Sequence, residues 1–181
     1  KIYLLTGHNG CGKTMLLRLI CGLISPDEGK RIEDEEYRYG VIIENPSFFT
    51  QETAMYNLKY LATINNLISK DDIEVWLNKF NLLEHKADKV KTFSLGMKQR
   101  LSLCQAFMEN PDVLLLDEPT NDLDLKSINW LQEFLINFEN TVIVVSHDRY
   151  FLNKVCTHIA DVDFGKIKVY PGNYDFWYES S

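Results

Sequence analysis

The feature that most constrains this chain is a glycine-rich segment between a short apolar run and an amphipathic one. Residues 2–5 predict a strand, and apolar residues at helical spacing predict a helix over 13–24. The segment between them matches the pattern GxxxxGK[ST] with Gly7, His8, Asn9, Gly10, Cys11, Gly12, Lys13 and Thr14. Glycines let the backbone curl so that its N–H groups converge on an anion at the positive end of a helix. The segment therefore predicts a phosphate-binding loop rather than a plain turn with a surface lysine.

Two side chains of this loop have expected contacts of their own. Lys13 is predicted to hold the β- and γ-phosphates of a nucleotide, and the hydroxyl of Thr14 is predicted to bind Mg²⁺.

Strand and helix patterns alternate along the rest of the chain. Further strands are predicted at 41–43, 113–116 and 141–145, with a hairpin-like pair near 159–164 and 166–170. Helices are predicted within 54–81, where Ser69 and Asp72 suit a capping box, and at about 97–108, 126–138 and 150–155. This order predicts an α/β fold, a mostly parallel sheet flanked by helices with an inserted helical lobe at 45–95.

Polar side chains follow two of the apolar strands. Asp117 and Glu118 come directly after one strand, and His147 comes shortly after another. Functional groups of open α/β sheets gather at the carboxyl ends of the strands, so these side chains are predicted to lie beside the phosphate loop. Asp117 would bind Mg²⁺, Glu118 would polarise an attacking water, and His147 would contact the γ-phosphate and orient that water. A solvated carboxylate and a structural histidine are the alternatives.

A second helix start with anion-binding character begins at Ser94. The hydroxyl of Ser94 can bond phosphate oxygens, and Gly96 permits a close backbone approach. A simple Ser N-cap is the alternative interpretation.

Taken together, these motifs resemble an ABC-type ATPase. The resemblance rests on the phosphate loop, the signature-like residues 93–100, the strand and carboxylates at 113–119, residues 121–124 and His147, in this order. It implies that the chain is a P-loop NTPase that binds ATP and Mg²⁺ and hydrolyses ATP. It also implies a homodimer in which Ser94 and Gly96 complete the partner's ATP site, with Asn121–Asp124 linking the two sites; Asp124 can also cap the following helix.

The sequence departs from the family pattern at Glu44. Most members of the family have a glutamine there, which touches Mg²⁺ and the water, and a glutamate keeps an oxygen ligand while adding negative charge. An exposed loop residue is the alternative. Residues 1 to about 110 resemble the bacitracin- and lantibiotic-export type of ATPase, whereas residues from about 111 to 181 resemble ABC-F proteins. A mosaic or joined chain would explain this difference, and a natural intermediate between the two types is the alternative.

Charge and composition limit the partners and the compartment that we expect for this chain. A formal charge of −7 disfavours nonspecific binding to nucleic acid. The four cysteines are scattered and show no metal-ligand spacing, so they suit buried or free thiols in a reducing compartment. No apolar run is long enough to span a bilayer. The chain opens in a strand without Met and lacks the early strands and the adenine-stacking aromatic residue of the family. We therefore interpret it as a fragment and expect a single ABC ATPase domain over 1–181.

Three functions are consistent with the sequence. We expect the ATPase subunit of an exporter of a peptide, antibiotic or similar small molecule, cytoplasmic and peripheral to the inner face of the cell membrane. Its transmembrane permease would contact the groove with Phe48, Phe49 and Tyr56, aromatic residues that equally suit the core of the lobe. An ABC-F factor acting on the ribosome is the alternative. The third possibility is a module that binds ATP without turnover.

Overall fold

A computed structural model describes residues 1–44, 47–163 and 165–180. In this part of the chain one sheet has the strand order β2-β3-β4-β1-β5-β6. The strands are β1 (Ile2–Thr6), β2 (Tyr39–Ile42), β3 (Val113–Asp117), β4 (Thr141–Val145), β5 (His158–Asp163) and β6 (Lys166–Pro171). All neighbouring pairs are parallel except β5 and β6, which are antiparallel. The predicted α/β class and mostly parallel sheet are therefore confirmed.

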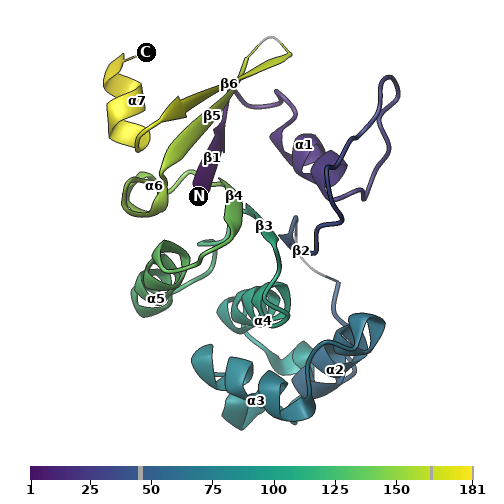
Figure 1. The fold of residues 1–181 in the computed structure, drawn as a ribbon. Helices are drawn as coiled ribbons and strands as arrows, with labels where there is room; N and C mark the ends of the chain where they lie inside the picture. The colour runs from purple at the N-terminus through teal and green to yellow at the C-terminus, as the bar shows by residue number, and fades with distance from the viewer. Residues whose placement is uncertain (45–46, 164, 181) are drawn as a thin grey trace.

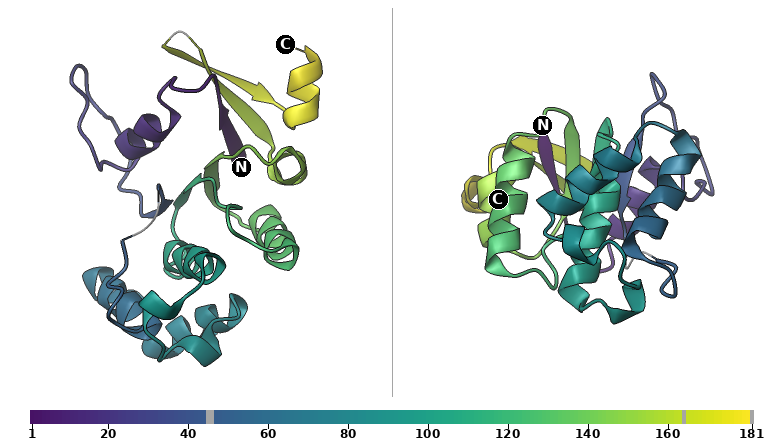
Figure 2. Two further views of the ribbon diagram at one scale, coloured as in Figure 1. Left: turned by 180° about the vertical axis from the view of Figure 1, so that it is seen from behind. Right: turned by 90° about the horizontal axis from the view of Figure 1, so that it is seen from below.

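Helices cover both faces of the sheet. The helix α1 (Lys13–Ile20) lies on one face, and α4 (Leu95–Phe107), α5 (Leu125–Ile136) and α6 (Arg149–Val155) lie on the other (Figure 1). Between β2 and α4 the chain forms α2 (Ala54–Asn65), α3 (Lys70–Lys79) and the short 3₁₀ turns η1 (Leu83–His85) and η2 (Val90–Thr92). Figure 2 shows α2 and α3 beyond α4, away from the sheet, and the final helix α7 (Tyr174–Ser180) beside α6.

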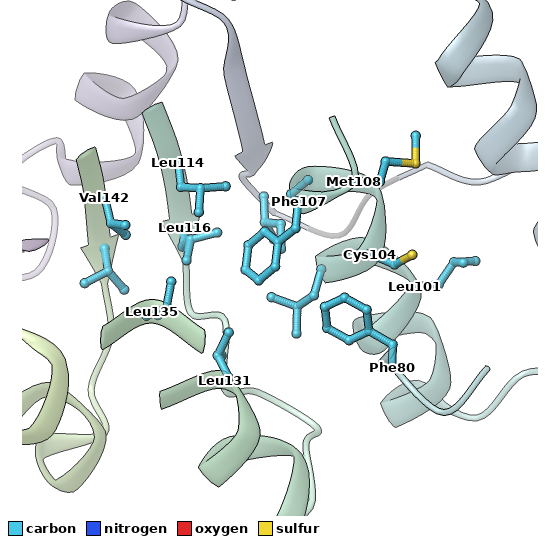
Figure 3. Close-up of a cluster of buried hydrophobic side chains, with 14 of the residues drawn as sticks. Phe80, Leu101, Cys104, Phe107, Met108, Leu114, Leu116, Leu131, Leu135 and Val142 are labelled. Carbon is cyan, nitrogen blue, oxygen red and sulfur yellow. The ribbon is translucent and has the colours of Figure 1, made fainter. Parts of the chain in front are cut away.

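Alternation along the strands divides the core into two clusters. Leu114 and Leu116 of β3 point toward α4 and α5, while Leu115 between them points toward α1, because successive side chains of a strand face opposite sides of the sheet. Figure 3 shows side chains of α4, α5, β3 and β4 meeting in the larger cluster. Phe107 is fully buried there, and its ring stacks on Phe134 with ring centres 4.6 Å apart. This packing fixes the strands whose ends carry the predicted site residues.

Local signals set several element ends as predicted. Ser69 and Asp72 form the predicted capping box at the start of α3. By contrast, α1 ends at Ile20 rather than at residue 24, because Gly22 adopts the left-handed conformation (φ 75°) and Leu23 turns back to donate to the Arg18 carbonyl oxygen. The helix predicted from the apolar spacing included Leu23, but the side chain of Leu23 is exposed.

The helix α7 was not predicted. It starts after Gly172, and its aromatic rings pack on one another and on a cation of α6. The ring centres of Tyr174 and Trp177 are 5.9 Å apart, and the guanidinium of Arg149 lies 5.5 Å from the Tyr174 ring centre. Contacts between distant residues, such as that of Arg149 with Tyr174, decide short helices, so a local pattern does not reveal such a helix. Among the helices described, none combines the length and apolar character that crossing a membrane requires.

Candidate active site

The phosphate loop connects β1 to α1, as predicted. Gly10 and Gly12 have positive φ angles of 81° and 98°, and the Cys11 amide donates to the His8 carbonyl oxygen at 3.2 Å. No side chain caps the start of α1, and its first turn has no acidic residue. The first amides of α1 therefore remain available to an anion, which the helix dipole also attracts.

Gly7 is required by the neighbouring strand. A Cβ atom at this position would lie 2.6 Å from the Val162 carbonyl oxygen of β5, closer than real Cβ contacts. A larger residue would push the beginning of the loop away from the sheet, so glycine here sets where the loop starts.

Lys13 lies back over the loop. Its Nζ atom donates to the carbonyl oxygens of Gly7 at 2.9 Å and His8 at 3.1 Å, and lies 3.8 Å from Cys11 Sγ. Within the described residues no carboxylate forms an ion pair with Lys13. The loop therefore holds a positive charge whose partners here are neutral, which suits an anionic ligand.

Thr14 and Asp117 meet although they are 103 positions apart in the sequence. The Thr14 hydroxyl donates to Asp117 Oδ2 at 2.8 Å. Thr14 follows β1 and Asp117 ends β3, and β4 is paired with both of these strands. The prediction that Asp117 lies beside the phosphate loop is confirmed. A hydroxyl and a carboxylate are both oxygen donors of the kind that Mg²⁺ prefers.

Glu118 and His147 also meet, at the ends of neighbouring strands. The carboxylate of Glu118 accepts from the His147 amide at 3.3 Å and lies 3.3 Å from His147 Nε2. Glu118 has φ 49°, and its own amide donates to the Val145 carbonyl oxygen. Backbone strain of this kind concentrates at functional sites, and here it turns Glu118 away from Asp117 and toward His147.

Glu44 lines a pocket of about 310 Å³ together with Asp117 and Glu118. Its carboxylate, however, pairs with Arg18 of α1, with Nη2 and Oε1 2.6 Å apart. Over the described residues, no three of the His, Cys, Asp and Glu side chains are arranged to hold a metal ion. The predicted ligands Thr14 and Asp117 are thus brought together, whereas the Glu44 carboxylate is engaged elsewhere.

Ser94 forms the N-cap of α4, the alternative interpretation of its role. Its hydroxyl accepts from the Met97 amide at 3.1 Å. At Gly96 a Cβ atom would lie 2.7 Å from the Asp122 carbonyl oxygen, so the predicted close approach exists, but within the chain. In the part of the chain described, no hydrogen bond or ion pair joins Ser94 or Gly96 to the phosphate loop. Asp124 caps α5 by accepting from the Ser127 amide at 2.7 Å.

Sequence reasoning missed two residues of this region. Arg18 gave no signal, because its relevance depends on the end of β2 lying near α1. Gln99 donates from Nε2 to the Pro119 carbonyl oxygen at 3.1 Å and lines the 310 Å³ pocket. This contact joins α4 to the segment after the carboxylates, and only the packing of α4 on the sheet reveals it.

The site defines a P-loop nucleotide-binding domain. Its features are a phosphate loop before α1, a Thr–Asp pair across the sheet and a Glu–His pair at adjoining strand ends. The chain belongs to the ABC transporter ATP-binding family, whose model matches residues 1–121. Domains of this family bind and hydrolyse ATP.

This chain resembles known ABC transporter ATP-binding proteins and also a translational throttle protein. It is 43% identical to the ABC transporter ATP-binding protein YkpA of Bacillus subtilis, over 99% of this chain but 40% of YkpA. With YybJ of the same organism, also an ABC transporter ATP-binding protein, it shares 39% identity over 92% of this chain and 82% of YybJ. The energy-dependent translational throttle protein EttA of Escherichia coli is 31% identical, over 96% of this chain and 38% of EttA.

The fold has a close match among solved structures. The ATP-binding subunit of an ABC transporter superposes with a TM-score of 0.85 at 23% identity, covering 99% of this chain and 81% of that one. At this level of identity the likeness concerns the fold alone.

Proposed function

We propose that this chain binds ATP at the phosphate loop and hydrolyses it as the ATPase subunit of an ABC transporter that exports a peptide, antibiotic or similar small molecule. The observation that carries the proposal is the 2.8 Å hydrogen bond from Thr14 to Asp117. This bond joins the end of the phosphate loop to the end of β3. A magnesium ion bound to a triphosphate needs oxygen ligands from the protein, and Thr14 and Asp117 supply one oxygen donor from each of these two segments.

Each side chain of the site has a proposed role. The phosphates would be surrounded by residues of the loop, and Mg²⁺ would be held by Thr14 and Asp117, with Glu44 as a further ligand; the loop residues are Gly7, His8, Asn9, Gly10, Cys11, Gly12 and Lys13. Magnesium, when bound, supplies charge neutralisation at the phosphate oxygens. Glu118 accepts a proton from the attacking water, and His147, at 3.3 Å from that carboxylate, contacts the γ-phosphate and orients the water.

Residues 1–181 are proposed to form a single ABC ATPase domain with residues 45–95 as its helical lobe. In support, Ile73 and Leu77 of α3 belong to the same buried cluster as Leu116 of the sheet. The lobe and the sheet therefore share a core in the described part of the chain. Residues 45 and 46, at the start of the lobe, lie outside the described residues.

A second copy of the chain is the proposed partner of the ATP site. Ser94 and Gly96 would contact the nucleotide of the other copy, which agrees with the lack of a bond from either residue to its own phosphate loop in the described residues. Leu95 beside them is 67% exposed, and Leu125 after the Asp124 cap is 69% exposed. Association of two copies would cover these apolar side chains and remove them from water.

The proposed permease contacts the groove beside Phe49. This pocket of about 360 Å³ lies between β2 and α2. Phe49 is 50% exposed and makes edge-to-face contacts with Tyr56 and Tyr60, which are also exposed, whereas Phe48 is partly buried against the core. Exposed aromatic side chains are typical anchors of protein interfaces. A chain bound there would lie at the inner face of the cell membrane.

The alternative function is that of an ABC-F factor that uses ATP on the ribosome. The identity with EttA over 96% of this chain favours it. The chain spans about 40% of the length of YkpA and 38% of that of EttA.

Nucleotide binding is tested by calorimetry with Mg-ATP on the purified chain. Lys13→Ala should abolish the heat of association because it removes the charge that faces the phosphates. The matched control Lys30→Ala removes an exposed lysine from the loop after α1 and should bind as the wild type does. If Lys13→Ala binds ATP as tightly as the wild type, the assignment of the site is wrong.

Turnover and partner are tested with Glu118→Gln. This variant should bind ATP without hydrolysing it and accumulate as a dimer in size-exclusion chromatography; Glu133→Gln, an exposed position on α5, is the control. Hydrolysis at the wild-type rate by Glu118→Gln would remove Glu118 from its role. Co-sedimentation of Glu118→Gln with ribosomes from cell extract would favour the ABC-F alternative over the exporter.

A further inference from the structure

Arg18 and Glu44 form an ion pair at the margin of the proposed metal site. Arg18 lies one helical turn after Thr14, so both side chains share a face of α1. Glu44 follows the end of β2, and its carboxylate lies 2.6 Å from the Arg18 guanidinium. The pair therefore joins α1, which carries the proposed metal ligand Thr14, to the segment that follows β2.

The Glu44 carboxylate has two competing partners. It lines the same pocket as Asp117 and Glu118, yet the described His, Cys, Asp and Glu side chains form no metal-binding group while Glu44 is bound to Arg18. Glu44 also has φ 62°, an uncommon conformation for a non-glycine residue. A carboxylate bound to a guanidinium has its charge neutralised, and here it is held at Arg18, one helical turn along α1 from Thr14.

We propose that Arg18 is a positioning residue that holds Glu44 away from the metal until magnesium arrives with the nucleotide. This inference rests on the proposed function. Without metal, Arg18 neutralises a carboxylate that would otherwise repel the triphosphate; when Mg²⁺ is bound, the Glu44 carboxylate would be free to leave Arg18 and to serve as a further oxygen ligand. A glutamine in place of Glu44 would need no such partner, because an amide carries no charge.

The size of the effect follows from the exposure of the pair. The side chains of Arg18 and Glu44 are 30% and 63% exposed. Ion pairs of this exposure change equilibria by at most about fivefold. The ion pair is thus strong enough to favour the position of Glu44 beside Arg18. It is also weak enough to break when a divalent cation binds the Glu44 carboxylate, because such a cation binds a carboxylate more strongly in water than a guanidinium does.

The test measures ATP affinity by calorimetry over a series of Mg²⁺ concentrations and in EDTA. In Arg18→Met, the Mg²⁺ concentration that gives half of the full affinity should fall by about twofold to fivefold, and the affinity in EDTA should fall. Arg18→Lys keeps the charge and should behave like the wild type. Lys70→Met removes a positive charge from the exposed Lys70–Glu74 pair on α3 and is the matched control.

A double-variant comparison ties the effect to Glu44. In a Glu44→Gln background, Arg18→Met should leave the Mg²⁺ dependence unchanged, because its partner is already neutral. The proposal is overturned if Arg18→Met needs as much Mg²⁺ as the wild type or more, or if its effect persists with Glu44→Gln. Should Arg18→Met not fold, Arg18→Gln is measured in the same way. Failure of the wild type to bind ATP at any Mg²⁺ concentration would instead contradict the proposed function.

Discussion

Substituting Gly96 by alanine tests whether the signature-like helix is fixed within its own chain. Gly96 is the second residue of α4, and an added Cβ would lie 2.7 Å from the Asp122 carbonyl oxygen. Because the atom it meets is backbone, the loop that contains Asp122 has to move. Overpacking costs about 1–3 kcal/mol in general, and a clash with backbone belongs in the upper part of that range, at about 2–3 kcal/mol; the better helix propensity of alanine returns about 1 kcal/mol. We therefore expect Gly96→Ala to lose about 1–2 kcal/mol in free energy of unfolding.

This loss is measurable without nucleotide. For a chain of this size it corresponds to a fall in Tm of about 2–8 °C, observed by circular dichroism in the absence of ATP. Leu95→Ala is the control, since Leu95 lies next to Gly96 in the same turn but is exposed, and its Tm should change little. If Gly96→Ala is as stable as the wild type or more stable, the contact with Asp122 does not constrain α4, and only a role toward nucleotide would explain the glycine.

Three further predictions concern the core, the thiols and a helix cap. Phe107→Ala should lower the free energy of unfolding by about 3–5 kcal/mol in urea titrations, because it leaves a cavity beneath the sheet. Burial raises the pKa of Cys104, and raises that of Cys156 to about 12, so in native protein at pH 8 mass spectrometry should find iodoacetamide on Cys11 and not on these two; labelling of either would contradict their burial. Asp124→Ala should cost about 1 kcal/mol. Hydrogen bonds from Ser127 lower the pKa of Asp124, so this cost should be full above the ordinary carboxyl range and vanish as the pH falls through the lowered pKa.

Much of the fold follows from local patterns. Strand and helix periodicity predicted the sheet elements and the helices α1 to α6, with ends displaced by a few residues where caps decide them, as Gly22 does for α1. The rule that strand ends gather at one edge predicted that Asp117 would meet the phosphate loop, and the hydrogen bond to Thr14 confirms it. The roles of Glu118, His147 and Ser94 in catalysis and across a dimer remain predictions.

The sequence by itself determined the phosphate loop, the strand-ending carboxylates and the caps at Ser69 and Asp124, because glycine freedom, alternation and capping act over a few residues. Only the tertiary structure decided that Arg18 binds Glu44 and that Gly96 lies against Asp122. Such pairs depend on strand order and on how α1 and α4 pack on the sheet. These arrangements are settled by burial of the whole core, which no short stretch of sequence contains.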